Sequence, residues 1–592
     1  MSDSKTYSND YPRDFNSASP PKQRSPRTSL DVDLNQTIYN LEGTTFTQGH
    51  PEYEAVSVSE YVTSENAAQV STNTVSSGMN PTYRAVVGTV DEFRFSREVA
   101  ESRLKSSQHD RVVITDDLDS NPDQTVVVRA LIRAMTKQDS ETEPSESAKY
   151  LVYSMHNSVP SNVDRKVAEC DTFNEALIVA AHGESAISRE LISINAVSVP
   201  AKVNTKIRAL VVCNAYPSNA QIYRNGFIHS RVEKYVESGI DVDVYYLHEP
   251  ATQETEYTYR GINVTLGNAE SYRKYLSDSS YDVYLVHFAT QRMIEPIKEY
   301  APNNKAIVWI HGFEAEAWHR RWFNFLESPD SMAKILEMKD GYYREQTIFN
   351  KELYRNASKQ FHFVNVSDWF KTHIVEPDSG VKFRPRDSST IPNLIDGEFF
   401  DYRKKEADHR TKILSIRPFA SHKYANDLTV DAIAQLSEKP WFENMEFTIC
   451  GHGRLFKDVT KRLNGFNNVR LVNRFLTREE IRNAHSNHGV FLAPTRFDSQ
   501  GVSTNEAMAS GLVPISSDVS AIPEFISHFE SGLLARRESS NELAYLIELL
   551  YFDSELFQRL SRGAAIQIRE KAGYGSTAAE EIRLIQDCVG FE

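Results

Sequence analysis

Two acids and a glycine turn lie close together in the C-terminal third of the chain and can bind a phosphorylated ligand. Residues 498–514 read Asp-Ser-Gln-Gly-Val-Ser-Thr-Asn-Glu-Ala-Met-Ala-Ser-Gly-Leu-Val-Pro. The apolar run 490–495 before them is typical of a buried strand, and a short helix that ends at Gly511 is expected after the turn. Such a junction aims backbone N–H groups and the positive end of a helix dipole at one point, which favours a phosphate. Asp498 precedes that point and Glu506 follows it, so the two acids can contact different parts of one ligand.

A helix start without a ligand is the simpler interpretation of the same residues. Ser503 and Glu506 have the Ser-x-x-Glu spacing of a capping box, in which the two side chains only satisfy backbone N–H groups. That interpretation explains neither Asp498 nor the turn at Gly501. We therefore favour phosphate binding, with the backbone N–H groups of Gly501, Val502 and Ser503 as donors to phosphate or sugar.

Residues 498–514 resemble the nucleotide-sugar signature of family 4 retaining glycosyltransferases of the GT-B fold. In that signature two acids are separated by seven residues and followed by Ala-Met-Ala-x-Gly-x-Pro. The first acid is Asp498 in this chain, where the family usually has Glu. The resemblance covers about residues 205–592 and implies a nucleotide-diphosphate sugar, a UDP- or GDP-sugar, as donor. It also implies that Glu506 binds the ribose and that Asp498 contacts sugar hydroxyls.

Two cations, Arg417 and Lys423, follow the predicted strand 412–416. Arginine offers a planar fork and lysine a point charge, so together they can hold a diphosphate. The family binds the donor diphosphate and stabilises the leaving group with an Arg and a Lys at this place. Its usual glycines before the Arg and after the Lys are Ile416 and Tyr424 here. Solvated surface cations are the alternative, but the acid pair downstream favours phosphate binding.

Three further candidates depend on the same resemblance. His311 ends a predicted strand, where the family has a His that faces the transferred sugar; a neutral imidazole can bind a hydroxyl or help to move a proton. Gly453 lies in a glycine turn where the family lets the nucleotide approach the backbone. Gly226 lies in a loop that resembles the one under the donor sugar, and glycine permits a close approach there. An ordinary structural histidine and ordinary tight turns are the alternatives.

An aromatic stripe and three acidic pairs are weaker signals. Trp318, Trp322 and Phe325 recur at a spacing typical of a helix face in the core, with an acceptor platform or a shallow membrane contact as alternatives. We predict no metal site, because the cations and the helix dipole are expected to neutralise the diphosphate. Asp-x-Asp pairs, which resemble the metal motif of the other main glycosyltransferase fold, lie at 31–33, 117–119 and 241–243.

Strands and helices alternate from about residue 205, which predicts parallel sheets covered by helices. We expect an α/β GT-B architecture: a Rossmann-like domain at 204–396 on the acceptor side, a second at 397–575 on the nucleotide-sugar side, a cleft between them, and a terminal helix at 576–592. The predicted strands are 207–213, 242–247, 282–287, 306–311, 361–366, 390–396, 412–416, 447–450, 469–472, 489–492 and 513–516.

The first 200 residues lie outside the resemblance. Residues 1–80 are rich in Ser, Thr, Asn and Pro, which predicts a disordered tail. Residues 81–203 contain several alternating runs, which predict a β-sandwich-like accessory domain. Assembly into a homo-oligomer, structural support and glycan binding stay open as its role. The predicted strands here are 124–135, 148–155, 173–181 and 191–199.

Composition limits the classes of protein. A chain of 592 residues can hold three or four domains, and a net charge of -15 argues against nucleic acid as a partner. The N-terminus is polar, and no run approaches the roughly 18 apolar residues of a membrane span. We expect a cytoplasmic protein, with peripheral membrane association left open. No metal-ligand spacing links the four cysteines, which we expect to be reduced: Cys170, Cys213, Cys450 and Cys588.

Together these features predict a retaining, metal-independent glycosyltransferase that uses no cofactor beyond its nucleotide-diphosphate sugar. Its acceptor is a glycan, a glycolipid or a glycoprotein, and retention is implied by the resemblance alone. One alternative is a glycan-binding or scaffold protein with a degenerate GT-B fold, which Asp498 and the missing glycines near Arg417 motivate. The other is a GT-B epimerase or phosphorylase. The sequence leaves the sugar, the base and the acceptor open.

Overall fold

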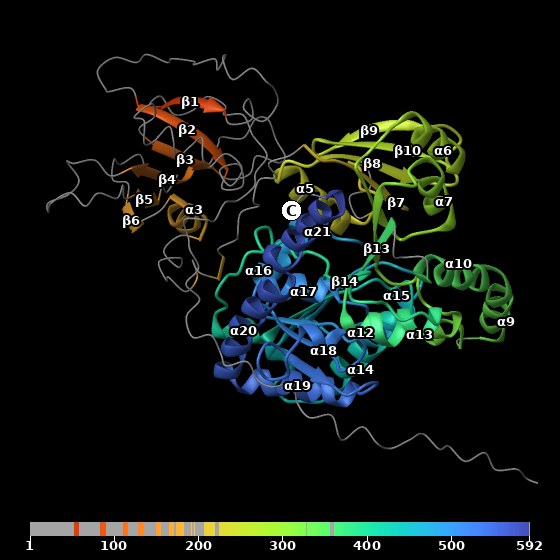
Figure 1. The fold of residues 1–592 in the computed structure, drawn as a ribbon. Coiled ribbons are helices and arrows are strands. Elements are labelled where there is room, and N and C mark those ends of the chain that lie inside the picture. The colour runs from red at the N-terminus through yellow and green to blue at the C-terminus, as the bar shows by residue number, and fades with distance from the viewer. Residues whose placement is uncertain are drawn as a thin grey trace, which may run out of the picture. The chain divides into compact units, whose positions relative to one another are not determined.

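The computed structural model describes residues 206–219, 224–326, 328–355 and 360–590, together with shorter stretches of the first 200 residues. Those stretches are 53–57, 83–89, 111–115, 128–134, 150–154, 165–170, 173–182, 191 and 194–195. The described strands form one sheet before residue 171 and two larger Rossmann-like halves after residue 206, as Figure 1 shows.

The N-terminal sheet has six strands in chain order, β1 to β6. Strands β1, β2 and β3 run parallel to one another, and β3 to β6 form an antiparallel meander. Helix α3 (Phe173–His182) packs against β4, β5 and β6. The strands are β1 (Tyr53–Ser57), β2 (Tyr83–Thr89), β3 (Arg111–Thr115), β4 (Val128–Ala134), β5 (Tyr150–Ser154) and β6 (Arg165–Cys170).

This region differs from the prediction in three ways. Strand β1 lies inside the predicted disordered tail 1–80, the rest of which lies outside the described residues. The run 173–181 is helix α3 and not a strand, because residues 175–180 are all buried and so show no strand or helix periodicity, while three alanines favour a helix. The described residues within 191–199 are helical as well. The segments described here form one sheet with a helix, so the predicted β-sandwich is not confirmed.

The first Rossmann-like half contains an eight-stranded sheet in the order β14-β13-β12-β11-β7-β8-β10-β9. All neighbouring strands are parallel except the edge pair β9 and β10. The strands are β7 (Arg208–Cys213), β8 (Asp241–Leu247), β9 (Thr255–Tyr259), β10 (Ile262–Gly267), β11 (Val283–His287), β12 (Lys305–Ile310), β13 (Phe361–Asn365) and β14 (Ser388–Thr390).

Six predicted strands are confirmed in this half, and one of them is shorter than predicted. The run 390–396 keeps only its first residue in the sheet, because β14 ends at Thr390 and Pro392 has no N–H to donate to a neighbour. Strands β9 and β10 were not predicted. Four of the five residues of β9 are at least partly exposed on this sheet edge, so the strand lacks the apolar run that marks a central strand.

The second half contains a six-stranded parallel sheet in the order β17-β16-β15-β18-β19-β20. Its five predicted strands are confirmed, and β20 is additional. The strands are β15 (Lys412–Ile416), β16 (Glu446–Cys450), β17 (Val469–Val472), β18 (Val490–Leu492), β19 (Val513–Ser517) and β20 (Leu533–Ala535).

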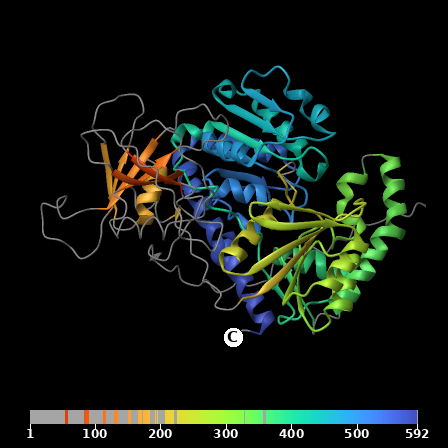
Figure 2. The same ribbon diagram turned by 90° about the horizontal axis from the view of Figure 1, so that it is seen from above.

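Helices pack on both sheets because the central strands are buried along their whole length. The helices of the first half are α5 (Gly226–Glu237), α6 (Ala269–Asp278), α7 (Gln291–Tyr300), η4 (Trp318–Arg321), α8 (Trp322–Phe325), α9 (Pro329–Met338), η5 (Lys339–Tyr343), α10 (Arg344–Arg355), α12 (Asp368–Phe370), η6 (Lys371–Val375) and α13 (Glu376–Ser379). Helices α9 and α10, green in Figure 2, lie at the edge of this half.

The second half adds a larger set of helices. They are η7 (Ala407–Thr411), η8 (His422–Tyr424), α14 (Asn426–Leu436), η9 (Phe442–Asn444), α15 (Phe456–Thr460), η10 (Lys461–Leu463), α16 (Arg478–Asn487), α17 (Val502–Ala509), α18 (Ile522–Phe525), α19 (Ser540–Phe552), α20 (Ser554–Ala572), η11 (Tyr574–Ser576) and α21 (Ala578–Val589). Helix α21 occupies the place of the predicted terminal helix.

Helix α21 packs against α5 and β12 of the first half and not against its own sheet (Figure 1). Glu581 on α21 is fully buried and lies 3.3 Å from Nη2 of the fully buried Arg231 on α5. Trp309 on β12 donates its indole N–H to the same carboxylate at 2.9 Å, and the hydroxyl of Tyr235 donates to it at 2.5 Å. The last helix is therefore fixed to the first half by a buried charge pair, whose carboxylate also accepts these two hydrogen bonds.

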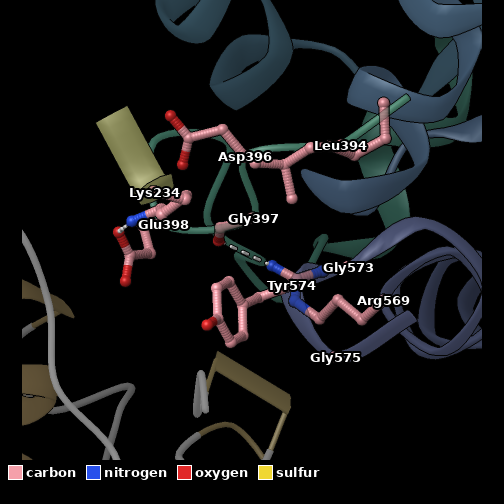
Figure 3. A pocket seen from close by; sticks show the side chains of 10 residues that line it. Lys234, Leu394, Asp396, Gly397, Glu398, Arg569, Gly573, Tyr574 and Gly575 are labelled. Atoms are coloured by element: carbon pink, nitrogen blue, oxygen red, sulfur yellow. Dashed lines mark hydrogen bonds and ion pairs between the residues drawn. The ribbon is translucent and has the colours of Figure 1, made fainter. Parts of the chain in front are cut away.

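The chain crosses between the halves at 394–398 and again at 573–575, and the two crossings lie together. The backbone N–H of Ile395 donates to the carbonyl oxygen of Ala572 at 2.8 Å. Figure 3 shows the small cavity of about 100 Å³ beside them, where Lys234 points toward Glu398 and Arg569 reaches the carbonyl oxygen of Gly397. This arrangement places the hinge between the halves on the side of helix α5.

Candidate active site

A cleft of about 690 Å³ is lined by residues of both Rossmann-like halves. His311 follows the end of β12 and faces it from the first half, whereas Arg417 follows the end of β15 and faces it from the second. Asp498 and Glu506 line it as well. The carboxyl ends of parallel strands thus meet at one cleft, where doubly wound folds bind their ligands.

Helix α17 begins at this cleft from a glycine in a left-handed conformation. Gly501 has φ of 86° and is the N-cap of the helix, a conformation that favours glycine. A glycine has no side chain, so the N-cap residue makes no side-chain capping bond, and neither Ser503 nor Glu506 occupies the N-cap position. The capping-box interpretation of Ser503 and Glu506 is therefore wrong. The first turn of α17 instead offers its N–H groups and dipole to the cleft, since Val502 and Ser503 line it.

Asp498 holds the turn before α17 in place. One of its carboxylate oxygens, Oδ1, accepts hydrogen bonds from the N–H groups of Gln500 at 3.3 Å and Gly501 at 3.0 Å. The other oxygen lies 3.7 Å from Nη2 of Arg417. The shorter acid thus reaches its own loop backbone and the nearby guanidinium. Its predicted contact with sugar hydroxyls stays a prediction.

Arg417 is buried at the base of the cleft with only 4% of its surface exposed. Its Nη1 donates to the hydroxyl of Ser503 at 2.9 Å, which joins the exit of β15 to the first turn of α17. Its Nε is buried and has no hydrogen-bond partner in the described part of the chain. A buried donor without a partner is costly, so a ligand oxygen at this point would be stabilised.

Lys423 lies on the short helix η8 and lines the same cleft. Its Nζ lies 5.7 Å from the ring centroid of Tyr424, and Cζ of Arg417 lies 4.9 Å from the same centroid. The residue at the sequence departure, Tyr424, is thus within cation–π distance of both cations. The structure brings Arg417 and Lys423 together as predicted.

Two histidines of the first half share a hydrogen bond beside the cleft. Nδ1 of His287 and Nε2 of His311 lie 2.9 Å apart, and both rings are buried. Burial, followed by the positive charge of Arg231, holds the pKa of both imidazoles well below the ordinary histidine value. Both rings are therefore neutral near pH 7. His287, the last residue of β11, is thus the direct neighbour of His311.

Glu506 lies on the cleft side of α17, one turn beyond Val502. Burial raises the pKa of its carboxyl to about 7, with a smaller contribution from the negative charge of Asp396; the guanidinium of Arg478 acts in the opposite direction. The carboxyl therefore changes its charge near neutral pH. A ligand that donates hydrogen bonds to it would favour the ionised form.

The predicted glycines Gly453 and Gly226 lie outside the lining of the cleft, in two different places. Gly453 packs against the backbone of Phe419, where an added Cβ would lie 2.2 Å from the carbonyl carbon, and it does not line the cleft. Gly451 of the same turn does line it. Gly226 begins helix α5 and lines a neighbouring cavity of about 270 Å³, which shares Val502 and Glu506 with the cleft.

An amide pair that the sequence did not indicate joins the acid loop to the hinge. The side-chain oxygen of Gln500 accepts from the backbone N–H and the side-chain amide of Asn393, at 2.7 and 2.8 Å. Its side-chain amide donates to the carbonyl oxygen of Asn393 at 3.0 Å. The hydroxyl of Ser499 donates to the carbonyl oxygen of His311 at 2.6 Å. Loop 498–501 is thus fixed to both halves, and no local pattern predicts contacts between residues so far apart.

The aromatic stripe belongs mainly to the core. Phe325 is buried and Trp318 packs against it with ring centroids 5.8 Å apart, so neither residue lines the cleft. Trp322 packs beside the hydrophobic core. A membrane contact of this stripe stays a prediction.

The acidic pairs do not combine into a larger cluster in the described residues. These residues contain no group of three or more His, Cys, Asp and Glu that could hold a metal ion. In the pair 241–243, both acids lie within 4 Å of Arg208. The pairs 31–33 and 117–119 lie outside the described residues.

Residues 410–553, which hold every predicted second-half site residue, match the family described as glycosyl transferases group 1. The amylovoran biosynthesis glycosyltransferase AmsK of Erwinia amylovora is 30% identical over 163 residues, which are 26% of this chain and 39% of that protein. The sucrose synthase of Melioribacter roseus is 24% identical over 126 residues, which are 20% of this chain and 16% of that protein. The chain spans less than half of the length of these two curated relatives.

A solved structure supports the fold. The sucrose-phosphate synthase of Thermosynechococcus elongatus has a TM-score of 0.50 and 14% identity, over 64% of this chain and 98% of that chain. At this identity the likeness concerns the fold, which is the α/β GT-B fold with two parallel sheets. Among the described residues, no helix is long and apolar enough to cross a membrane.

Proposed function

We propose that this protein is a retaining glycosyltransferase that takes a sugar from a nucleotide-diphosphate donor. The observation that carries the proposal is Arg417. It is buried at the cleft, bound to Ser503 in the first turn of α17, close to Asp498, and has an unsatisfied Nε. A diphosphate supplies what this arrangement lacks, namely negative charge and acceptor oxygens beside a helix N-terminus.

The second half of the chain would bind the donor. Arg417 and Lys423 hold the diphosphate, while the N–H groups of Val502 and Ser503 donate to phosphate or sugar oxygens. Glu506 lies one helical turn further on and accepts hydrogen bonds from the ribose hydroxyls. The match of residues 410–553 to glycosyl transferases group 1 supports this division, because it covers the same residues.

The reaction breaks the bond between the anomeric carbon and the phosphate oxygen and forms a bond from that carbon to the acceptor oxygen. In a retaining transfer both oxygens lie on the same face of the sugar, and the leaving phosphate accepts the acceptor proton. Arg417 and Lys423 stabilise the negative charge that develops on the leaving phosphate. The neutral ring of His311 faces the cleft from the other half and is suited to bind a sugar hydroxyl.

We further infer that the transfer needs no divalent metal, because two cations and a helix dipole already face the diphosphate position. The acceptor is a glycan, or a glycan carried by a lipid or a protein. A role in polysaccharide biosynthesis fits the amylovoran enzyme among the relatives. The N-terminal sheet is proposed to serve assembly or support.

Donor hydrolysis without acceptor tests the proposal. UDP-, GDP- and ADP-sugars are supplied singly, and the released nucleotide is measured for the wild-type protein and for Arg417→Ala. We expect one donor to be hydrolysed slowly by the wild type and at least tenfold more slowly by the variant. Binding of a nucleotide sugar without any turnover would favour the scaffold alternative. A sugar phosphate or an epimerised donor as product would identify a phosphorylase or an epimerase.

A further inference from the structure

Three phenylalanine rings and the imidazole of His311 line the first-half side of the cleft. Phe288 lies 4.6 Å from the imidazole of His311 and 5.6 Å from Phe313, measured between ring centroids, and it is stacked on Phe313 at 24°. Phe227 lies edge-on to the imidazole at 5.1 Å. All four residues line the cleft. A continuous aromatic wall thus extends from the proposed reacting centre toward solvent.

Phe288 holds a backbone conformation that bulky side chains rarely adopt. Its φ is 58°, directly after the buried His287 at the end of β11. A left-handed phenylalanine costs conformational energy, and such residues concentrate at functional sites. The conformation turns the chain at the strand exit so that the ring of Phe288 stacks on Phe313. Phe288 itself packs in the hydrophobic core, so the wall joins a core ring to the partly exposed ring of Phe313.

Phe313 is the outermost ring of the wall and has 41% of its surface exposed. Cζ of Arg321 lies 5.6 Å from its ring centroid. Nε of Arg321 donates to the carboxylate of Glu316 at 2.6 Å, and Glu316 is buried except for 6% of its surface. Both charged residues line the cleft. An exposed aromatic face therefore lies beside a fixed donor and acceptor pair.

The loop that carries Phe313 is rigid before any ligand binds. The carboxylate of Glu314 accepts from the N–H groups of His311 and Gly312, at 2.5 and 3.0 Å. The carbonyl oxygen of Glu314 accepts from the side-chain amides of Gln346 and Asn350 on α10, at 3.1 and 2.9 Å. The position of Phe313 is therefore preorganised, which lowers the entropy cost of binding.

We propose that Phe313, with the Arg321 and Glu316 pair, forms the acceptor subsite and that it binds a pyranose ring of a saccharide acceptor. This inference rests on the proposed transferase function. It names the class of substrate that binds in the part of the cleft opposite the donor. The C–H face of the pyranose stacks on the exposed ring, and its hydroxyls bond to the guanidinium and the carboxylate. The neighbouring His311 then faces the hydroxyl that attacks the donor sugar.

The same residues are poorly suited to a lipid tail. Glu316, Arg321 and Asn324 line the same cleft as the exposed ring, and a hydrocarbon chain would cover these polar groups without bonding to them. A saccharide hydroxyl can bond to them. An acceptor carried on a lipid would thus meet this subsite through its sugar, and the tail would lie outside it.

Steady-state kinetics on three variants tests this assignment. The probes are methyl α- and β-hexopyranosides and the same sugars with an octyl aglycone, each supplied with the donor that the wild type hydrolyses. We expect Phe313→Ala to raise the KM for the best acceptor at least tenfold while the donor KM changes less than twofold. Phe313→Tyr keeps the aromatic face and should restore the acceptor KM. Phe529→Ala is the matched control, because Phe529 has the same 41% exposure and does not line the cleft.

Failure of this inference differs from failure of the proposed function. An unchanged acceptor KM in Phe313→Ala, in a protein that transfers sugar normally, overturns only the subsite. If only acceptors with an octyl chain are used, and Phe313→Ala does not change their KM, the saccharide subsite is overturned in favour of a lipid contact. If the wild type turns over no donor, saturation-transfer NMR of the methyl glycosides decides, and signals that persist in Phe313→Ala overturn the subsite.

Discussion

The second half of the chain presents two cations and a helix N-terminus to the cleft, whereas the first half presents stacked rings with one Arg–Glu pair. Arg417 and Lys423 face it from strand exits and a helix N-terminus that attract anions. The neutral ring of His311 and the stacked rings of Phe288 and Phe313 face it from the opposite side. This difference indicates a division of work. One side is suited to a phosphorylated donor and the other to an uncharged acceptor.

The two sides also differ in how they are held. The charged side depends on short contacts within the second half, such as Arg417 to Ser503. The aromatic side is held by segments that follow the first half in the chain. Helix α21 packs against the first half, and Ser499 of the second half donates a hydrogen bond to the carbonyl oxygen of His311. A change at the end of the chain should therefore affect the aromatic side through stability, and a change at β15 should affect chemistry directly.

The largest expected effect is on stability. Glu581→Gln removes the charge that pairs with the fully buried Arg231, so an uncompensated cation remains in the core. We expect the free energy of unfolding to fall by about 3–5 kcal/mol, measured by chemical denaturation. Glu580→Gln, on the exposed side of the same helix, is the control and should change it by less than about 0.5 kcal/mol. Equal stability of the two variants would show that α21 does not hold the first half together.

Arg417→Ala should have the next largest effect, on catalysis. In the proposed mechanism the guanidinium stabilises charge that develops on the leaving phosphate, so kcat should fall by about 10²–10³-fold without a change in the melting temperature. The exposed Arg536 supplies the control, and Arg536→Ala should keep the wild-type kcat. Near-normal turnover in Arg417→Ala would remove the charged side of the cleft from the mechanism.

Variants of Asp498 distinguish two roles of its carboxylate, which are to hold the turn before α17 and to pair with Arg417. Asp498→Ala loses both the bonds to the turn and the pairing with Arg417, and transfer should fall by about 10–100-fold. Asp498→Asn keeps an oxygen for the N–H of Gly501, so full activity in this variant would limit Asp498 to the turn. Asp498→Glu restores the acid that the family usually has and should keep measurable transfer.

A pH dependence of nucleotide binding is the smallest of these effects. The carboxyl of Glu506 has a pKa of about 7 without ligand, and in the proposed donor site ribose hydroxyls bind its ionised form. Protonation therefore competes with the ligand, and the Kd of the preferred nucleoside diphosphate should be about tenfold weaker at pH 6 than at pH 8. Calorimetric titration measures this, and Glu506→Gln should remove the dependence over that range. A flat profile in the wild type would place Glu506 outside the ribose site.

The sheets of both halves could be predicted because their central strands are buried, apolar and bounded by turns. The edge strand β9 could not, since its exposed positions carry polar residues and no apolar run. Helix α3 was mistaken for a strand, because complete burial removes the periodicity that distinguishes the two. The ends of two strands could not be predicted from hydrophobicity alone. Strand β19 continues to Ser517 because that residue pairs with Ala535 of β20, and β14 ends at Thr390, two residues before Pro392.

The candidate site could be predicted where its residues are adjacent in the chain. Asp498, Ser503 and Glu506 lie within one strand–turn–helix unit, so their spacing carries the information. The pairs Asn393 with Gln500 and His287 with His311 depend on tertiary contacts, and no local spacing reveals them. Gly453 was predicted from its turn, but only the packing of that turn shows that Gly451 is the residue at the cleft.

The most direct measurement of the central claim is a proton NMR time course of the donor reaction in excess EDTA. The anomeric proton of the transferred or released sugar reports bond cleavage and configuration together. We predict that the first product has the anomeric configuration of the donor, that it forms without added metal, and that Arg417→Ala nearly abolishes it. An inverted first product, a strict need for added Mg²⁺ or Mn²⁺, or no cleavage of any nucleotide-diphosphate sugar would contradict the account.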